Sequence, residues 1–136
     1  MKMKTRFALM ALAAAFAGLA MADDMMLKLS GDNEVPPVKT AASGSGTISV
    51  AADKTISGSV TTTGVQGTMA HIHTAEAGKN GPVTIPLKAD GDGKWSVPAG
   101  TKLTDDQFEA LKAGKLYVNV HSAANPGGEV RAQLTK

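Results

Sequence analysis

The three histidines of this chain are spaced as metal ligands often are. His71 and His73 are separated by a single residue, and His121 lies in a later segment in which apolar and more polar residues alternate. In an extended strand, residues two apart point to the same face with their Cα atoms about 7 Å apart. Both imidazoles of the first pair are therefore predicted to reach the same point, and His121 is predicted to lie on the non-core face of its own strand.

If these two segments pair as neighbouring strands, the three imidazoles converge on one side of a sheet. Imidazole is the commonest protein ligand for zinc and copper, and three imidazoles with an open position make a competent site. The chain contains no cysteine, so an all-nitrogen site favours Cu(II), with Zn(II) as the other candidate. We therefore predict a Cu(II) or Zn(II) site at His71, His73 and His121. The alternative is that all three are rim histidines bonded to loop carbonyls, and their spacing does not decide between the two.

No complete catalytic motif accompanies the histidines. The sequence has no G-x-S-x-G elbow, no H-E-x-x-H helix and no thiol nucleophile. Ser122 follows His121 directly, but neighbours on a strand point to opposite faces and cannot form a dyad. A redox enzyme similar to copper-zinc superoxide dismutase needs more ligands than three histidines. We expect a protein that is not an enzyme.

The last polar set of the chain, Glu129, Arg131 and Gln133, is predicted to share one face of a strand. Its expected role is a ladder of solvated cross-strand pairs. Glu34 is a further acid, and nothing in the sequence brings it near Glu129.

Short alternating segments, separated by Gly, Pro, Asn and Asp, predict the strands that must position these residues. They indicate one antiparallel all-β domain, and they lie at residues 27–30, 47–50, 56–60, 69–74, 83–87, around 95, 115–121 and 128–134. One segment departs from this pattern. Thr104 and Gln107 fit a capping box, and Phe108 and Leu111 follow at helical spacing, which predicts one short helix near 104–113.

The first 22 residues have the form of a secretory signal peptide. A basic start precedes a short apolar run, and Ala-Met-Ala at 20–22 is a typical cleavage site. We expect cleavage there, a single domain over 23–136, a periplasmic or secreted location and no membrane anchor after cleavage.

The charge of the domain differs from that of the whole chain. Of the 14 Lys and Arg against 12 Asp and Glu, three bases lie in the leader. The remaining domain is almost neutral, so nucleic acid is not an expected partner. Pro36-Pro37 near an edge favours a monomer.

Four motifs in order resemble the CHRD domain, a module named after chordin and found in many bacterial exported proteins. They are residues 31–38, 71–83, 116–121 and 126–134. Ala75 and Ala132 stand where glycine is usual in that family. The resemblance implies an extracellular or periplasmic Greek-key β-sandwich, immunoglobulin-like or superoxide-dismutase-like, over nearly all of 23–136. It implies no established enzyme activity, and the histidine positions of the family match His71, His73 and His121.

Two functions stay open from the sequence. The first is an exported, non-enzymatic domain that binds copper or zinc through the three histidines. The second is an extracytoplasmic protein–protein interaction module without a metal, in which Glu34, Pro36-Pro37 and the turn around Asn80 form the recognition surface.

Overall fold

Residues 23–136 are described by a computed structural model, in which strands dominate. The predicted leader, residues 1–22, lies outside the described residues, and its cleavage stays a prediction. The elements in chain order are β1 (Asp23–Ser30), the 3₁₀ turn η1 (Gly31–Asn33), β2 (Ser43–Val50), β3 (Ile56–Thr63), β4 (Gly67–Thr74), β5 (Val83–Pro86), β6 (Lys88–Gly91), β7 (Lys94–Ser96), α2 (Asp105–Lys112), β8 (Leu116–Ser122) and β9 (Val130–Gln133).

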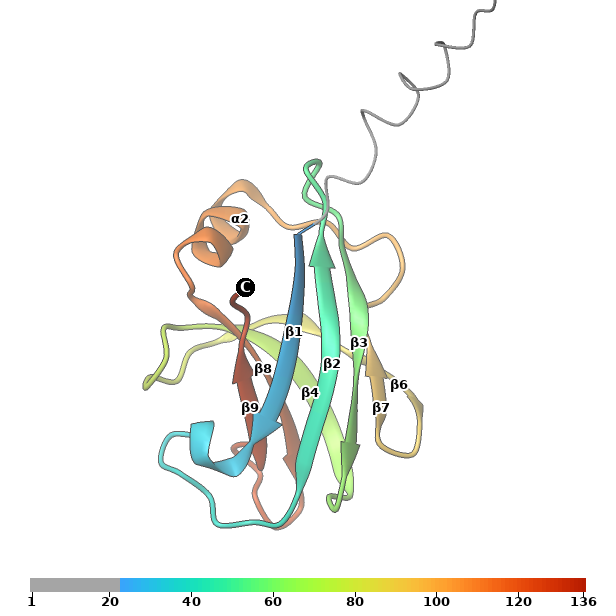
Figure 1. Ribbon diagram of the computed structural model, residues 1–136, viewed down its shortest axis with the longest axis vertical. Coiled ribbons are helices and arrows are strands. Elements are labelled where there is room, and N and C mark those ends of the chain that lie inside the picture. The colour runs from blue at the N-terminus through green and yellow to red at the C-terminus, as the bar shows by residue number, and fades with distance from the viewer. Residues whose placement is uncertain (1–22) are drawn as a thin grey trace, which may run out of the picture.

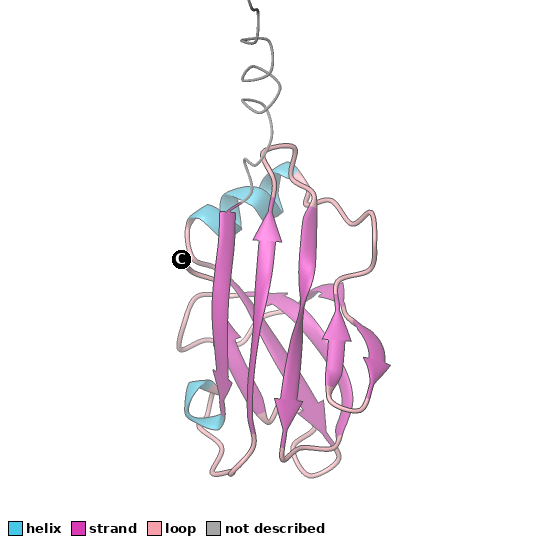
Figure 2. Ribbon diagram, turned by 45° about the vertical axis from the view of Figure 1, so that its right-hand side comes forward, coloured by secondary structure: helices cyan, strands magenta, loops and turns pink. Residues whose placement is uncertain are grey.

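The strands form two layers packed face to face (Figures 1 and 2). One layer contains β1, β2, β3, β7 and β6, and the other contains β5, β4, β8 and β9. All strand pairs are antiparallel. The layers are continuous only where β1 meets β9, through the single residue pair Ser30 and Arg131. The predicted all-β antiparallel fold is confirmed.

The segment 83–87, predicted as one strand, is divided at Leu87. The backbone N–H of Leu87 donates to the carbonyl of Ala70 on β4, 3.0 Å away, and the chain then leaves that layer. Residues 88–91 pair instead with β7 at the edge of the opposite layer.

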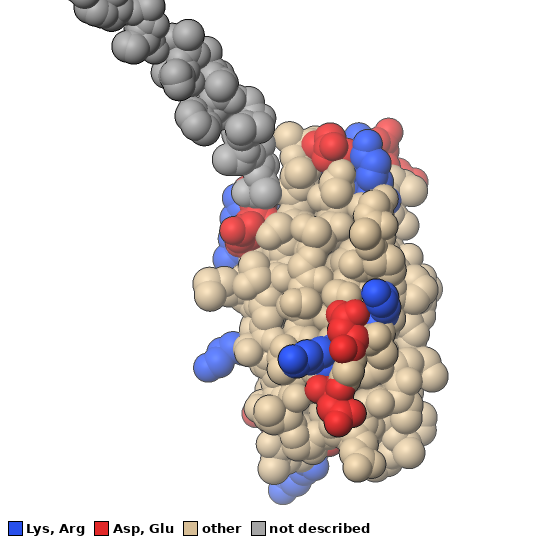
Figure 3. Space-filling model, turned by 90° about the vertical axis from the view of Figure 1, so that its right-hand side faces the viewer, with Lys and Arg blue, Asp and Glu red and all other residues tan. Residues whose placement is uncertain are grey.

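Figure 3 views the molecule from the side of β6 and β7, and the charged side chains visible there are of both signs and interspersed. This face therefore offers no single-sign patch to a polyanion.

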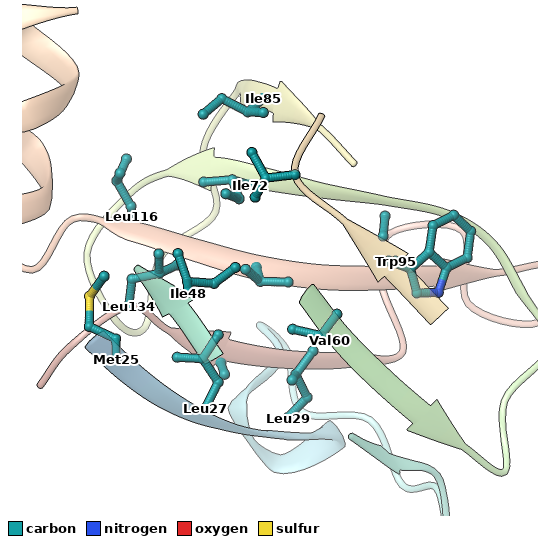
Figure 4. Packing of buried hydrophobic residues seen from close by; sticks show 14 of the residues in the cluster. Met25, Leu27, Leu29, Ile48, Val60, Ile72, Ile85, Trp95, Leu116 and Leu134 are labelled. Atoms are coloured by element: carbon teal, nitrogen blue, oxygen red, sulfur yellow. The ribbon is translucent and has the colours of Figure 1, made fainter. Parts of the chain in front are cut away.

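Alternation along the strands builds the core between the layers, and Figure 4 shows its side chains meeting there. On β1 every second side chain, from Met25 to Leu29, is buried and the side chains between them are exposed. Ile72 of β4 and Val118 of β8 face them from the other layer and are fully buried. The core is mainly aliphatic, with Trp95 as its large ring. Such burial of apolar area is the main force that holds the two layers together.

The predicted helix is confirmed as α2, at one end of the sandwich (Figure 1). Its N-terminus has the expected capping box: the Thr104 hydroxyl accepts from the Gln107 N–H, and the Gln107 side chain accepts from the Thr104 N–H. Phe108 and Leu111 pack on the core. Among the described residues, no helix combines the length and hydrophobicity that crossing a bilayer would require.

The outer face of the second layer is covered by loops. All seven residues of β8 are buried, including the polar residues that alternate with the core set. The expected solvated ladder on β9 is therefore wrong, because Glu129 and Arg131 are buried and Gln133 is partly buried. Alternation correctly assigns these side chains to one face, but loops from elsewhere in the chain exclude water from that face.

Candidate metal centre

Pairing of β4 with β8 brings the three histidines together. Met69 lies opposite His121, and His71 lies opposite Asn119. The Nδ1 atom of His71 is 3.0 Å from the Nε2 atom of His121. One ring nitrogen from each of the three histidines lies within 4.8 Å of the other two. The strand pairing that the sequence could only assume is present, and it gathers all three predicted ligands into one cluster.

Two backbone carbonyls hold the rings of His73 and His121. The Nδ1 atom of His73 is 3.0 Å from the carbonyl oxygen of Gly81, and that of His121 is 2.8 Å from the carbonyl oxygen of Pro126. A carbonyl oxygen can only accept, so Nδ1 carries a proton in both rings, and the lone pair of either ring in its neutral form lies on Nε2. Carbonyl partners of this kind orient metal-binding histidines in proteins. The Nε2 atom of His73 is buried and has no hydrogen-bond partner within residues 23–136.

The environment favours neutral imidazoles. Burial is the largest cause that lowers the pKa of His71, and the neighbouring His121 and His73 lower that pKa further. Burial also lowers the pKa of His73, with smaller contributions from His121 and Arg131, while the Gly81 carbonyl and the nearby Asn119 side chain oppose the lowering. Neutral rings offer lone pairs, which a metal ion needs. His71 and His73 are therefore prepared to donate nitrogen lone pairs at neutral pH.

A stack of three side chains supports the cluster from one side. The ring of His73 lies parallel to that of Tyr117, with centroids 4.9 Å apart, and the guanidinium of Arg131 lies 3.4 Å from the Tyr117 centroid. Arg131 also donates to the carbonyls of Glu76 and Lys79. These bonds fix the loop at 75–82, whose Gly81 carbonyl in turn orients His73. Arg131, which the sequence placed in solvent, is thus a central support of the site.

Glu34 belongs to the same buried region, and its position was not predictable from the sequence. It is 3% exposed, and burial raises the pKa of its carboxyl to about 7, against the opposing effects of an Asn119 hydrogen bond and of Arg131. A Cβ on Gly128 would lie 2.5 Å from Glu34 Oε2 and 2.4 Å from Asn119 Nδ2. Both side chains therefore pack directly on the bare backbone of Gly128. The glycine pair at 127–128 was the available signal for such a close approach.

Glu129 is buried next to that glycine and is well supplied with donors. The hydroxyls of Thr40 and Ser122 each donate to its carboxylate over 2.6 Å, and the Asn125 amide donates over 3.3 Å. The Ser122 bond is the largest cause that lowers the pKa of Glu129, followed by the Thr40 bond. The carboxylate is therefore held ionised, and its hydrogen bonds tie the loop before β2 to the hairpin between β8 and β9.

The comparison with known protein families agrees with the four sequence motifs at 31–38, 71–83, 116–121 and 126–134. The family model described as CHRD domain matches residues 26–134. The chain belongs to the CHRD domain family. The resemblance inferred from the four motifs is thereby confirmed, and the match includes all three histidines. No curated protein and no solved structure matches the chain. CHRD domains occur in extracellular proteins, and membership indicates a binding module of that kind.

Proposed function

We propose that this CHRD domain is an exported, non-enzymatic binding protein, periplasmic or secreted, which holds one Cu(II) or Zn(II) ion through His71, His73 and His121. The observation that carries the proposal is the buried, unpartnered Nε2 of His73 within a cluster of three imidazoles. A buried polar atom without a partner costs free energy, and a metal ion supplies the partner that this atom lacks.

The donor set fits a tetrahedral ion with one open position. Zinc–nitrogen bonds of 2.0–2.1 Å place ligand nitrogens about 3.3 Å apart in a tetrahedron. The separation of 3.0 Å between His71 Nδ1 and His121 Nε2 is close to that value, and to bind an ion through Nδ1 the neutral His71 ring would carry its proton on Nε2 instead. Ring rotation would close the spread of 4.8 Å among the three rings. His71 is the ring suited to adjust, since it is the most exposed of the three and no backbone carbonyl among the described residues holds its ring as one holds those of His73 and His121.

The location of His71 also indicates how an ion would enter. His73 and His121 are buried, whereas His71 is partly exposed. The fourth coordination position is expected to face solvent on that side, where water or a small donor completes the shell. Such a site binds and releases an ion without unfolding the domain, which suits metal storage or transfer outside the cytoplasm.

The test is a calorimetric titration of metal-stripped protein, residues 23–136, with Cu(II) and with Zn(II), beside His71→Ala and a variant with all three histidines replaced by alanine. His71→Ala is the decisive variant, because its side chain is the least buried and its loss disturbs the fold least. One-to-one binding with a micromolar or lower Kd is expected, weakened about 100-fold or more in His71→Ala. Lys28→Ala, on the outer face of the other layer, is the matched control. Millimolar binding, or equal binding in His71→Ala and the parent, would overturn the proposal.

A second candidate, a protein–protein interaction module, has one specific observation in its favour. Asn80 donates its side-chain amide to the Val35 carbonyl, 2.7 Å away, so the segments that the sequence offered as a recognition surface do lie together. With Pro36-Pro37 and residues 124–128 they line a groove of about 540 Å³. In this reading the histidines brace the loops at 81 and 126. It predicts that the triple alanine variant unfolds at a lower temperature than the parent, and that neither metal raises the parent's Tm.

A further inference from the structure

Met69 occupies the position next to the histidine cluster on β4. Burial alternates along this strand, with Ala70 and Ile72 in the core, so Met69 shares the outer face with His71 and His73. In the β4–β8 ladder, Met69 is directly opposite His121. Directly opposed side chains have Cβ atoms about 4.5–5.5 Å apart. Met69 is thus a cross-strand neighbour of one candidate ligand and a same-face neighbour of another.

Packing in the core does not explain why an apolar methionine occupies this position. Its side chain is 50% exposed, although it lies beside a strand whose residues are all buried. The register of β4 against β8 shifts between Gly67 and Met69, and such bulges commonly re-aim the next side chain near functional sites. Methionine has three rotatable bonds and a polarizable sulfur. It can therefore reach toward the partly exposed side of the cluster, where the open position is expected.

We propose that the thioether of Met69 is a fourth ligand of this centre and makes it a site that holds Cu(I). The inference rests on the proposed function, since it adds a ligand to the three histidines. Thioethers are soft ligands that select Cu(I), while imidazole accepts both copper and zinc. A centre of three imidazoles and one thioether therefore retains copper after reduction, whereas Zn(II) and Cu(II) binding depend mainly on the histidines.

The composition of the chain makes a direct spectroscopic test possible. The sequence contains no cysteine, so any sulfur bound to copper in this protein comes from methionine. Met26 offers a matched control: it is 83% exposed on β1, in the opposite layer. Met69→Leu and Met26→Leu remove the same atom in exchange for a side chain of similar volume, one beside the cluster and one away from it.

The experiment measures Cu(I) affinity by competition with a chromophoric Cu(I) chelator, under nitrogen with ascorbate, and Zn(II) and Cu(II) affinity by calorimetry. Met69→Leu is expected to weaken Cu(I) binding about tenfold or more and to change Zn(II) binding by less than about twofold. X-ray absorption of the Cu(I)-loaded protein should show a sulfur neighbour in the parent and in Met26→Leu, and none in Met69→Leu.

Three results would overturn the inference: Cu(I) affinity of Met69→Leu within about twofold of the parent, an equal loss in Met26→Leu, or a Cu(I) spectrum without sulfur. If the parent still binds Zn(II) or Cu(II) through the histidines in any of these cases, only the thioether ligand is refuted. If the parent binds none of the three ions, the proposed function fails with it.

Discussion

The outer faces of the two layers are treated differently by the rest of the chain. On the layer of β1, β2 and β3, polar side chains alternate outward into solvent in the usual antiparallel manner. On the layer of β4, β8 and β9, loops cover the outer face and bury histidine, tyrosine, asparagine and arginine side chains. Burial of polar groups has a cost that must be met by hydrogen bonds. One outer face is solvated and the other holds a buried polar cluster, and this difference can be tested by matched substitutions.

The largest difference is expected between Arg131→Met on the covered face and Lys28→Ala on the solvated face. Arg131 is 1% exposed, stacks on Tyr117 and bonds to two loop carbonyls. Its loss removes these hydrogen bonds and the stacking on Tyr117 and frees the loop at 75–82, so we expect a loss of about 3 kcal/mol in the free energy of unfolding. Lys28→Ala should change it by less than about 0.5 kcal/mol. Urea unfolding followed by Trp95 fluorescence measures both, and equal changes would contradict the comparison.

Two serine-to-carboxylate hydrogen bonds of equal length, one on each outer face, allow a closely matched comparison of stability losses. Ser122 donates to Glu129 on the covered side, and Ser49 donates to Asp24 on the solvated side, each over 2.6 Å. Ser122→Ala removes a bond to a buried carboxylate, with an expected cost of about 2 kcal/mol. Ser49→Ala should cost less than about 0.5 kcal/mol, because water replaces the lost donor. Chemical denaturation measures the change in the free energy of unfolding of each variant. Similar changes in the two variants would mean that the loops do not exclude water from Glu129.

Glu34 adds a pH dependence to the covered face. Its pKa in the folded protein is about 7, above the ordinary value of 4.5, chiefly because of burial. The unfolded chain therefore releases this proton at lower pH, and stability falls as pH rises through 7. The shift corresponds to at most about 3 kcal/mol, and solvent screening reduces the expectation to about 1–2 kcal/mol between pH 5 and pH 8. Glu34→Gln, which resembles the protonated acid, should remove this decline. The lowered pKa values of His71 and His73 make stability rise with pH over part of the same range, so the test is the difference between the two profiles. Parallel profiles of parent and variant from pH 5 to pH 8 would contradict the assignment.

The sequence was a good guide to features set by local pattern. Alternation predicted the strands, and Thr104 with Gln107 predicted where α2 begins. It also assigned the histidines to one face, because side-chain direction follows from strand geometry alone. The pairing of β4 with β8 was assumed rather than derived, since contacts between residues 71 and 121 depend on the path of the whole chain. The resemblance to the CHRD family implied a β-sandwich, but not which of its strands pair.

The errors have a common physical origin. Arg131 and Glu129 were predicted to be solvated because alternation names the face of a strand but not what covers that face. Glu34 was placed on a recognition surface, but it is buried, because its side chain lies against Gly128, about ninety positions away in the sequence. Covering loops and backbone contacts are set by tertiary structure, and no periodicity in one segment reports them.

The bonds that hold the covering loops have a consequence for sequence change. Arg131 reaches the carbonyls of Glu76 and Lys79, and two histidines reach the carbonyls of Gly81 and Pro126. A carbonyl group is supplied by any amino acid, so the side chains of Glu76 and Lys79, which are exposed, can be exchanged without removing a single acceptor. The exposed side chains of the loop at 75–82 are therefore open to change by evolution or by an engineer, while the backbone carbonyls keep the imidazoles in place.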